Sequence, residues 1–133
     1  MRFTSGLRLA TMCAVAFAVP ASANHSHGSY VDTFMDIQGV VKELHLVVPH
    51  SWIYLEVKAA TGEPEMWALE ATSRTGLQKI GVTPDYVKPG DTVKARCHHL
   101  RDGSNGCLLG FLKAKDGTVK DWDGNNAPPP PDF

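Results

Sequence analysis

The sequence predicts an all-β fold with one short helix, and three observations carry that prediction. Five stretches rich in β-branched, aromatic and aliphatic residues are separated by glycine- or proline-containing turns. Between the third and fourth stretches the apolar period changes from that of a strand to that of a helix. This element order is that of a five-stranded, OB-fold-like Greek-key barrel, with its helix between strands 3 and 4. A small β-sandwich or an open α+β sheet is the alternative.

The first strand is expected over residues 37–48. Within it, Val41 and Leu44 share the inner face only if a bulge falls at Lys42-Glu43, and such bulges are common where a strand curves. The stretch therefore predicts a bulged, curved first strand.

The second and third strands are expected over residues 52–58 and 66–71. In the second, Ile53 and Leu55 alternate with Trp52 and Tyr54, so the two aromatic side chains face away from the core.

A short helix is expected over residues 75–81, with Ser73 as a possible N-cap and Gly81 past its end. The fourth and fifth strands follow over residues 92–100 and 107–115.

The last two strands hold the two cysteines that remain after a leader is removed. A turn centred on Asp102 places Cys97 opposite Cys107, within the span of a disulfide. An even pair in a small exported domain favours a disulfide, with free thiols or thiolate metal ligands as the alternatives.

The first 23 residues are typical of a secretory signal peptide. Arg2 and Arg8 precede an apolar run over 9–19, and Ala21-Ser22-Ala23 is a small-x-small cleavage site. The run is shorter than the about 20 residues that span a bilayer. We therefore expect cleavage after Ala23 and a periplasmic or secreted protein without stable membrane insertion. The expected organisation is a signal peptide (1–23), a histidine-containing segment (24–36), the barrel domain (37–122) and a proline-rich disordered tail (123–133).

Charge bears on the class of partner. Removal of the leader leaves eleven of the thirteen Lys and Arg residues against all fourteen acids, a net charge of about −3. The sequence also contains no run of basic residues. The net negative charge and the lack of such a run together predict that nucleic acid is not a partner.

Histidines supply the candidate chemistry. Five of the six fall in three short stretches, and neutral imidazole suits copper and zinc. In an OB-like layout, His50 lies on the loop after strand 1 and His98 near the loop after strand 4, the loops that flank the binding face of such barrels. His25 and His27 join them if the N-terminal segment folds back. A transition-metal site is therefore one hypothesis.

The second hypothesis is a module without metal. Arg101 offers a planar fork for an anion, and Trp52 and Tyr54 offer a stacking surface for a small ligand or an envelope protein. No nucleophile elbow or zincin motif is found, so an enzyme is not expected and no catalytic residue is assigned.

Several motifs together resemble a family of short exported bacterial proteins, domain-of-unknown-function family 6152. The matching stretches are His25-Ser26-His27, Gly39-Val40-Val41-Lys42-Glu43, Val48-Pro49-His50-Ser51-Trp52-Ile53, Lys88-Pro89-Gly90-Asp91 and His98-His99-Leu100-Arg101-Asp102-Gly103-Ser104. Val48 replaces the usual Asn before Pro-His, and His99 replaces the Pro after the second histidine. The resemblance singles out His50, Trp52, His98 and Arg101, and it implies export and a shared fold without an assigned activity.

Overall fold

The structure is a computed structural model that describes residues 27–133. The predicted signal peptide and His25 lie outside the described residues. The elements in chain order are η1 (His27–Ser29), β1 (Tyr30–His45), β2 (Ser51–Lys58), β3 (Pro64–Ala71), α1 (Arg74–Lys79), β4 (Thr92–Leu100), β5 (Gly106–Lys113) and β6 (Val119–Asp121).

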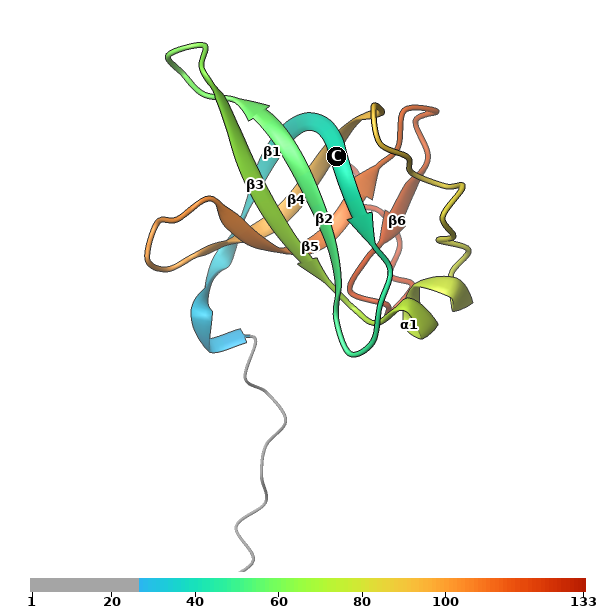
Figure 1. The fold of residues 1–133 in the computed structure, drawn as a ribbon. Coiled ribbons are helices and arrows are strands. Elements are labelled where there is room, and N and C mark those ends of the chain that lie inside the picture. The colour runs from blue at the N-terminus through green and yellow to red at the C-terminus, as the bar shows by residue number, and fades with distance from the viewer. Residues whose placement is uncertain (1–26) are drawn as a thin grey trace, which may run out of the picture.

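The six strands form one sheet in the order β3-β2-β1-β4-β5-β6, with a further pairing between β3 and β5 (Figure 1). All neighbouring pairs are antiparallel except β3 and β5, which pair in parallel. The fold is thus mostly antiparallel sheet with one short α-helix between the third and fourth strands, which confirms the predicted class. The five-stranded barrel is not confirmed, because residues 27–133 form six strands, with β6 added at the edge of β5.

β1 is long and bent, and it pairs with a different strand along each half. Residues 34–40 pair with β4, and residues 40–45 pair with β2. A register shift between Val41 and Glu43 marks the bulge predicted at this point. Gly39 precedes Val40, the residue at which β1 changes partner, and a Cβ atom on Gly39 would be only 2.6 Å from the backbone oxygen of Glu56. The bend therefore needs both an extra residue and a missing side chain.

The beginning of β1 corrects the predicted domain boundary. The strand starts at Tyr30, inside the segment 24–36 that was expected to precede the domain. Sequence pattern alone missed this part, because residues 32–36 are mostly exposed and do not alternate. Their partner strand β4 supplies the pairing that extends them.

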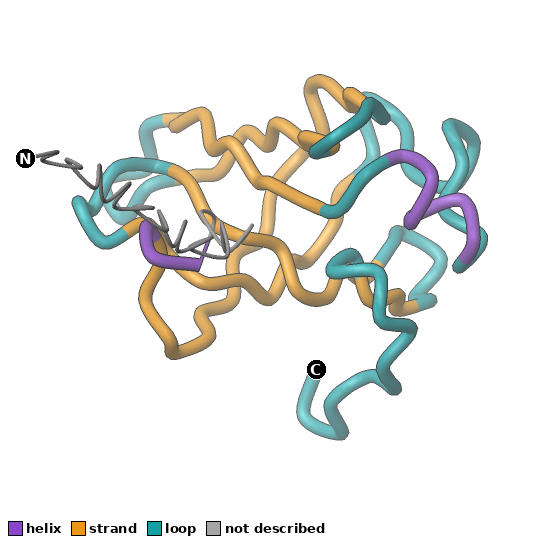
Figure 2. The backbone as a smooth tube through the Cα atoms, turned by 90° about the horizontal axis from the view of Figure 1, so that it is seen from below, coloured by secondary structure: helices purple, strands orange, loops and turns teal. Residues whose placement is uncertain are grey.

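The core lies on the inner faces of the strands, and α1 covers one end of it. Ser73 caps this helix by accepting a hydrogen bond from the backbone N–H of Gly76, as predicted. Gly81 follows with a φ of +84°, which ends the helical turn. α1 and η1 lie at opposite ends of the molecule (Figure 2). The fully buried side chains include Val41, Ile53, Leu55, Leu69, Leu77, Val82, Leu109, Leu112 and Trp122.

The β4–β5 hairpin holds the predicted disulfide in a different register. Cys97 and Cys107 are bonded with their Cα atoms 5.7 Å apart. However, Cys107 lies opposite His99, and Cys97 lies opposite Leu109. The turn is centred one residue later than predicted, on Gly103, whose φ of +80° only glycine adopts freely. Moving the centre by one residue shifts the register by two, so the disulfide is diagonal rather than direct.

The segment 123–133 also differs from the prediction of a disordered tail. The carboxylate of Asp121 accepts a hydrogen bond from the backbone N–H of Ala127, and Asp132 contacts Arg96 on β4. Composition alone indicated disorder, whereas these charged contacts place the segment against the sheet. None of the helices in residues 27–133 has the length and apolar character that crossing a membrane requires.

Candidate functional site

A row of directly paired residues crosses four neighbouring strand pairs on the outer side of the sheet. Trp52 on β2 pairs with Glu70 on β3, and Glu70 pairs with Leu108 on β5. Leu108 pairs with His98 on β4, which in turn pairs with Phe34 on β1. Paired residues point to the same face. The row therefore brings together predicted site residues from distant parts of the chain.

Glu70 is the polar centre of this row. Its residue is only 8% exposed, and each of its carboxylate oxygens has a partner. The hydroxyl of Tyr30 donates to Oε2 at 2.5 Å, and Nδ1 of His50 lies 2.7 Å from Oε1. A buried carboxylate is costly unless it is hydrogen-bonded or paired. The two contacts thus stabilise the carboxylate and fix both partners.

Tyr30 is itself buried, and its ionisation is suppressed. Burial of the phenol raises the pKa of Tyr30 well above its usual range, and the adjacent Glu70 carboxylate adds to this through its hydrogen bond and charge. The phenol therefore stays a hydrogen-bond donor across the physiological pH range.

His50 lies on the loop between β1 and β2, as predicted. The next residue, Ser51, is fully buried, and its Oγ lies 3.3 Å from both the backbone nitrogen and the backbone oxygen of Val47. This contact closes the loop that carries His50. The His50 side chain is 44% exposed while its Nδ1 faces Glu70. An imidazole fixed through one nitrogen presents the other for a metal ion or a proton.

His98 is on the same outer face but in different surroundings. Its ring lies 4.2 Å from the ring of Phe34, centroid to centroid. Its Nδ1 is buried and has no hydrogen-bond partner within residues 27–133. Strand β5 separates it from Glu70, and two strand spacings amount to about 10 Å. His98 is thus a member of the row, whereas His50 reaches the row only through its contact with Glu70, and the two histidines are not joined.

The N-terminal histidines, His25 and His27, were expected to join the site only if the N-terminal segment folds back. His27 begins η1, three residues before Tyr30, and His25 is outside the described residues. The backbone of η1 is held by Arg101, whose own N–H donates to the oxygen of Ser29 and whose Nε donates to that of Gly28. Within residues 27–133, no group of three or more His, Cys, Asp or Glu side chains is arranged to hold a metal ion.

The non-metal hypothesis relied on Arg101, Trp52 and Tyr54. Trp52 and Tyr54 alternate with buried residues on β2 and are half-buried, and Tyr54 also contacts His45 at 5.3 Å between ring centroids. Arg101 contacts Gly28 and lies 3.8 Å from the carboxylate of Asp32. Its guanidinium thus contacts the N-terminal segment rather than the aromatic residues of β2.

Sequence reasoning missed Glu70 and Tyr30. Glu70 lies within an apolar stretch, directly across from Trp52, and a lone acid inside such a strand is the signal that it is paired. Tyr30 gave no such signal, because its contact with Glu70 joins residues 40 positions apart.

The comparisons with known proteins identify the family. The family model described as a family of unknown function, DUF6152, matches residues 12–109. The chain belongs to this family, as the sequence motifs predicted. A comparison with curated proteins finds no match.

Two solved structures are similar to this fold. Both are crystal structures of a mitochondrial single-stranded DNA-binding protein from S. cerevisiae, the second labelled with selenomethionine. The first has 11% identity and a TM-score of 0.48, and the second has 10% identity and a TM-score of 0.45. Each match covers 62% of this chain and 92% of the other.

This finding corrects the prediction about partners. The sequence charge predicted that nucleic acid is not a partner, but the matched structures are of a protein that binds single-stranded DNA. Net charge is a property of the whole chain, whereas binding depends on where the charges gather. The exclusion of nucleic acid therefore does not stand.

Proposed function

We propose that this protein is a small exported binding protein without catalytic activity, and that it binds a transition-metal ion through Nε2 of His50. The observation that carries the proposal is the 2.7 Å contact between Nδ1 of His50 and the buried carboxylate of Glu70. Metal-binding histidines almost always donate their second ring N–H to a carboxylate, carbonyl or water, which fixes the ring and raises its basicity.

A second histidine in the structure shows why burial of the carboxylate matters. His45 also contacts a carboxylate, that of Glu43, at 2.9 Å. That carboxylate is 63% exposed, whereas the side chain of Glu70 is 11% exposed and also bonds Tyr30. The ring of His50 therefore contacts a buried carboxylate with a second hydrogen-bond partner, whereas the ring of His45 contacts an exposed one.

The remaining ligands in this proposal are His27 and His25. η1 is held by two hydrogen bonds to Arg101, and the next residue, Tyr30, bonds the same carboxylate as His50. Imidazole ligands favour copper or zinc. His98 takes no part in this ligand set, because its ring stacks on Phe34.

The fold and the location complete the proposal. The β3–β5 pairing links the third strand to the fifth, and this supports an OB-type barrel with β6 as an addition. The leader features of residues 1–23 support export with cleavage after Ala23. Sequencing the N-terminus of protein recovered from the periplasm should begin at Asn24. Full-length protein in the cytoplasm would contradict this part.

The metal site is tested with tag-free protein titrated with Cu²⁺ and Zn²⁺ by calorimetry, alongside elemental analysis of the purified protein. We expect saturable binding that His50→Ala lowers at least tenfold. His45→Ala is the matched control, since it removes an exposed, carboxylate-paired histidine elsewhere, and it should leave binding unchanged. A His25→Ala/His27→Ala double variant should also weaken binding. The proposal would be contradicted if the purified protein contains no metal and gives no binding heat with Cu²⁺ or Zn²⁺. It would also be contradicted if His50→Ala binds metal as tightly as the parent.

A further inference from the structure

The segment 123–133 ends on a cluster of positive side chains from β4 and β5. Nη1 of Arg96 donates to the carboxylate of Asp132 at 2.7 Å. The ring of Phe133 lies 4.8 Å from Nζ of Lys94, 5.0 Å from Cζ of Arg96 and 5.2 Å from Nζ of Lys113. Asp132 and Phe133 thus fill adjacent parts of one site, which we call the basic site (Lys94, Arg96 and Lys113).

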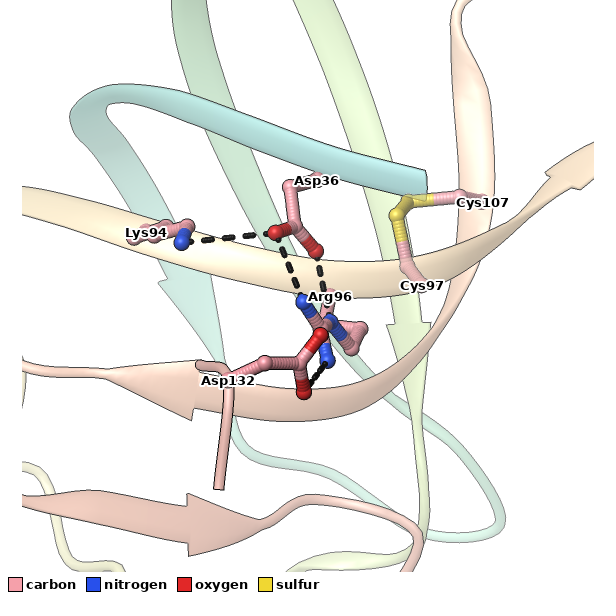
Figure 3. A network of polar contacts seen from close by, with 6 residues as sticks. All are labelled: Asp36, Lys94, Arg96, Cys97, Cys107 and Asp132. Carbon is pink, nitrogen blue, oxygen red and sulfur yellow. Dashed lines mark hydrogen bonds and ion pairs between the residues drawn. A yellow bond between two sulfur atoms is a disulfide. The ribbon is translucent and has the colours of Figure 1, made fainter. Parts of the chain in front are cut away.

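Arg96 gives the basic site its geometry. Its Nε and Nη2 donate to the two carboxylate oxygens of Asp36 at 2.7 and 3.0 Å. This bidentate pair fixes the plane of the guanidinium and leaves Nη1 for Asp132, and Figure 3 shows the two carboxylates meeting it from different sides. The Arg96 side chain is only 13% exposed. A guanidinium that is oriented in this way is a recognition element for carboxylates.

The charges of the basic site call for an anion. Lys94, Arg96 and Lys113 carry three positive charges, and on the sheet Asp36 contacts both Lys94 and Arg96 with one negative charge. Without the segment, the site therefore has two uncompensated positive charges. Asp132 supplies one negative charge, and the ring of Phe133 presents its electron-rich face to cations within 6 Å. A carboxylate beside an aromatic ring is thus the chemistry that fits.

The segment is attached in a way that permits exchange. Asp121 holds Ala127, and four prolines at 128–131 then lead to the contact residues. Prolines fix φ, so a short tether of this kind loses little conformational entropy when it binds. The side chain of Asp132 is 74% exposed, so solvent reaches the contact.

We infer that the basic site is a receptor for peptides that carry an acidic residue next to an aromatic one, and that Asp132 and Phe133 occupy it as a tethered, displaceable ligand. The inference is independent of the metal site, because it uses neither His50 nor Glu70. The protein's own segment occupies the basic site in preference to a free peptide, because tethering gives it a high effective concentration. A partner with the same pair of side chains competes for the same contacts.

The test uses the full chain with Asp132→Asn/Phe133→Ala, which vacates the basic site. The probe is a synthetic peptide with the sequence of residues 126–133, blocked at both ends and titrated into ¹⁵N-labelled protein. We expect saturable amide shifts at Lys94, Arg96 and Lys113. The parent protein should require at least tenfold more peptide for the same shift. Peptides with Asn for Asp or Ala for Phe should each bind at least fivefold more weakly.

Added substitutions in the vacated protein locate the interaction. Arg96→Gln should abolish the shifts. Lys113→Gln leaves the Arg96–Asp36 pair intact and should weaken binding severalfold. This second variant keeps the test valid if Arg96→Gln fails to fold. Lys79→Gln on α1 is the charge-matched control and should change nothing. Absence of shifts at millimolar peptide would overturn the inference. So would equal affinity in the parent and vacated proteins, or equal affinity after Lys113→Gln.

Discussion

Nδ1 of His50 lies 2.7 Å from Oε1 of Glu70, a carboxylate that the sheet buries and that Tyr30 also bonds. The imidazole is therefore exposed on one side and fixed on the other. Fixing a ligand ring before an ion arrives lowers the entropy that binding must overcome. Glu70 therefore gives the ring of His50 an orientation, which an exposed histidine without such a partner would lack.

Glu70→Gln keeps the shape of the side chain but removes the charge that orients His50. We expect the affinity for Cu²⁺ or Zn²⁺ to fall roughly ten- to a hundredfold, the usual effect of losing such a partner. Calorimetric titration measures it. Glu43→Gln, which alters the exposed partner of His45, is the control and should leave affinity unchanged. Equal affinities for the Glu70 and Glu43 variants would contradict the orienting role.

Tyr30 makes stability depend on pH in the alkaline range. Its folded pKa is raised, mainly by burial, so above pH of about 10 the unfolded chain releases a proton that the folded protein keeps. The free energy of unfolding should therefore fall as the pH rises above about 10. Tyr30→Phe should flatten this decline, as urea denaturation at several pH values measures. Burial also raises the pKa of Tyr86. Tyr86 therefore adds to the loss of stability at alkaline pH, and Tyr86→Phe should flatten the decline independently of Tyr30→Phe.

The Cys97–Cys107 disulfide closes a loop with a sequence separation of 10. Chain-entropy arguments give a short loop of this size about 2–3 kcal/mol of stabilisation. A reductant should lower the unfolding free energy by about that amount in urea. The Cys97→Ala/Cys107→Ala variant should have a lower free energy of unfolding than the parent without reductant, and reductant should not change it. A parent protein that is equally stable in both conditions would contradict this expectation.

Gly39→Ala tests the bend in β1. The added Cβ would lie 2.6 Å from the backbone oxygen of Glu56, and a backbone atom cannot give way as the end of a flexible side chain can. We expect a loss of about 1–3 kcal/mol, as for other overpacked sites. Gly28→Ala is the matched control, because nothing lies within 4 Å of its added Cβ, and it should cost less than about 0.5 kcal/mol. Thermal or urea denaturation of both variants decides the comparison.

Local patterns in the sequence predicted the parts of the fold that local chemistry determines. The bulge after Val41 followed from apolar alternation, and the Ser73 cap followed from helix-start chemistry. The β4–β5 register was wrong by two residues, because Asp102 and Gly103 are both good turn centres and only the positive φ decides between them.

The candidate site was predictable only in part, for a physical reason. His50 and His98 were proposed as ligands from residue type alone, and the structure places His50 on the loop between β1 and β2 and His98 within β4. Their partners were not recognised, because Tyr30 and Glu70 meet across 40 positions and Arg96 and Asp132 across 36. Contacts of that kind depend on which strands become neighbours. The apolar periodicity of a single strand carries no information about its neighbours.

The central position of β1 has a consequence for the order of folding. β1 is hydrogen-bonded to β2 along one half and to β4 along the other, and Asp36 meets Arg96 across 60 positions. The sheet therefore cannot form around β1 until the chain is available through Leu100. Loop closure over such distances is slow compared with hairpin formation. A chain translocated from its N-terminus would thus remain without its native sheet until most of it had crossed, which is compatible with the export that we propose.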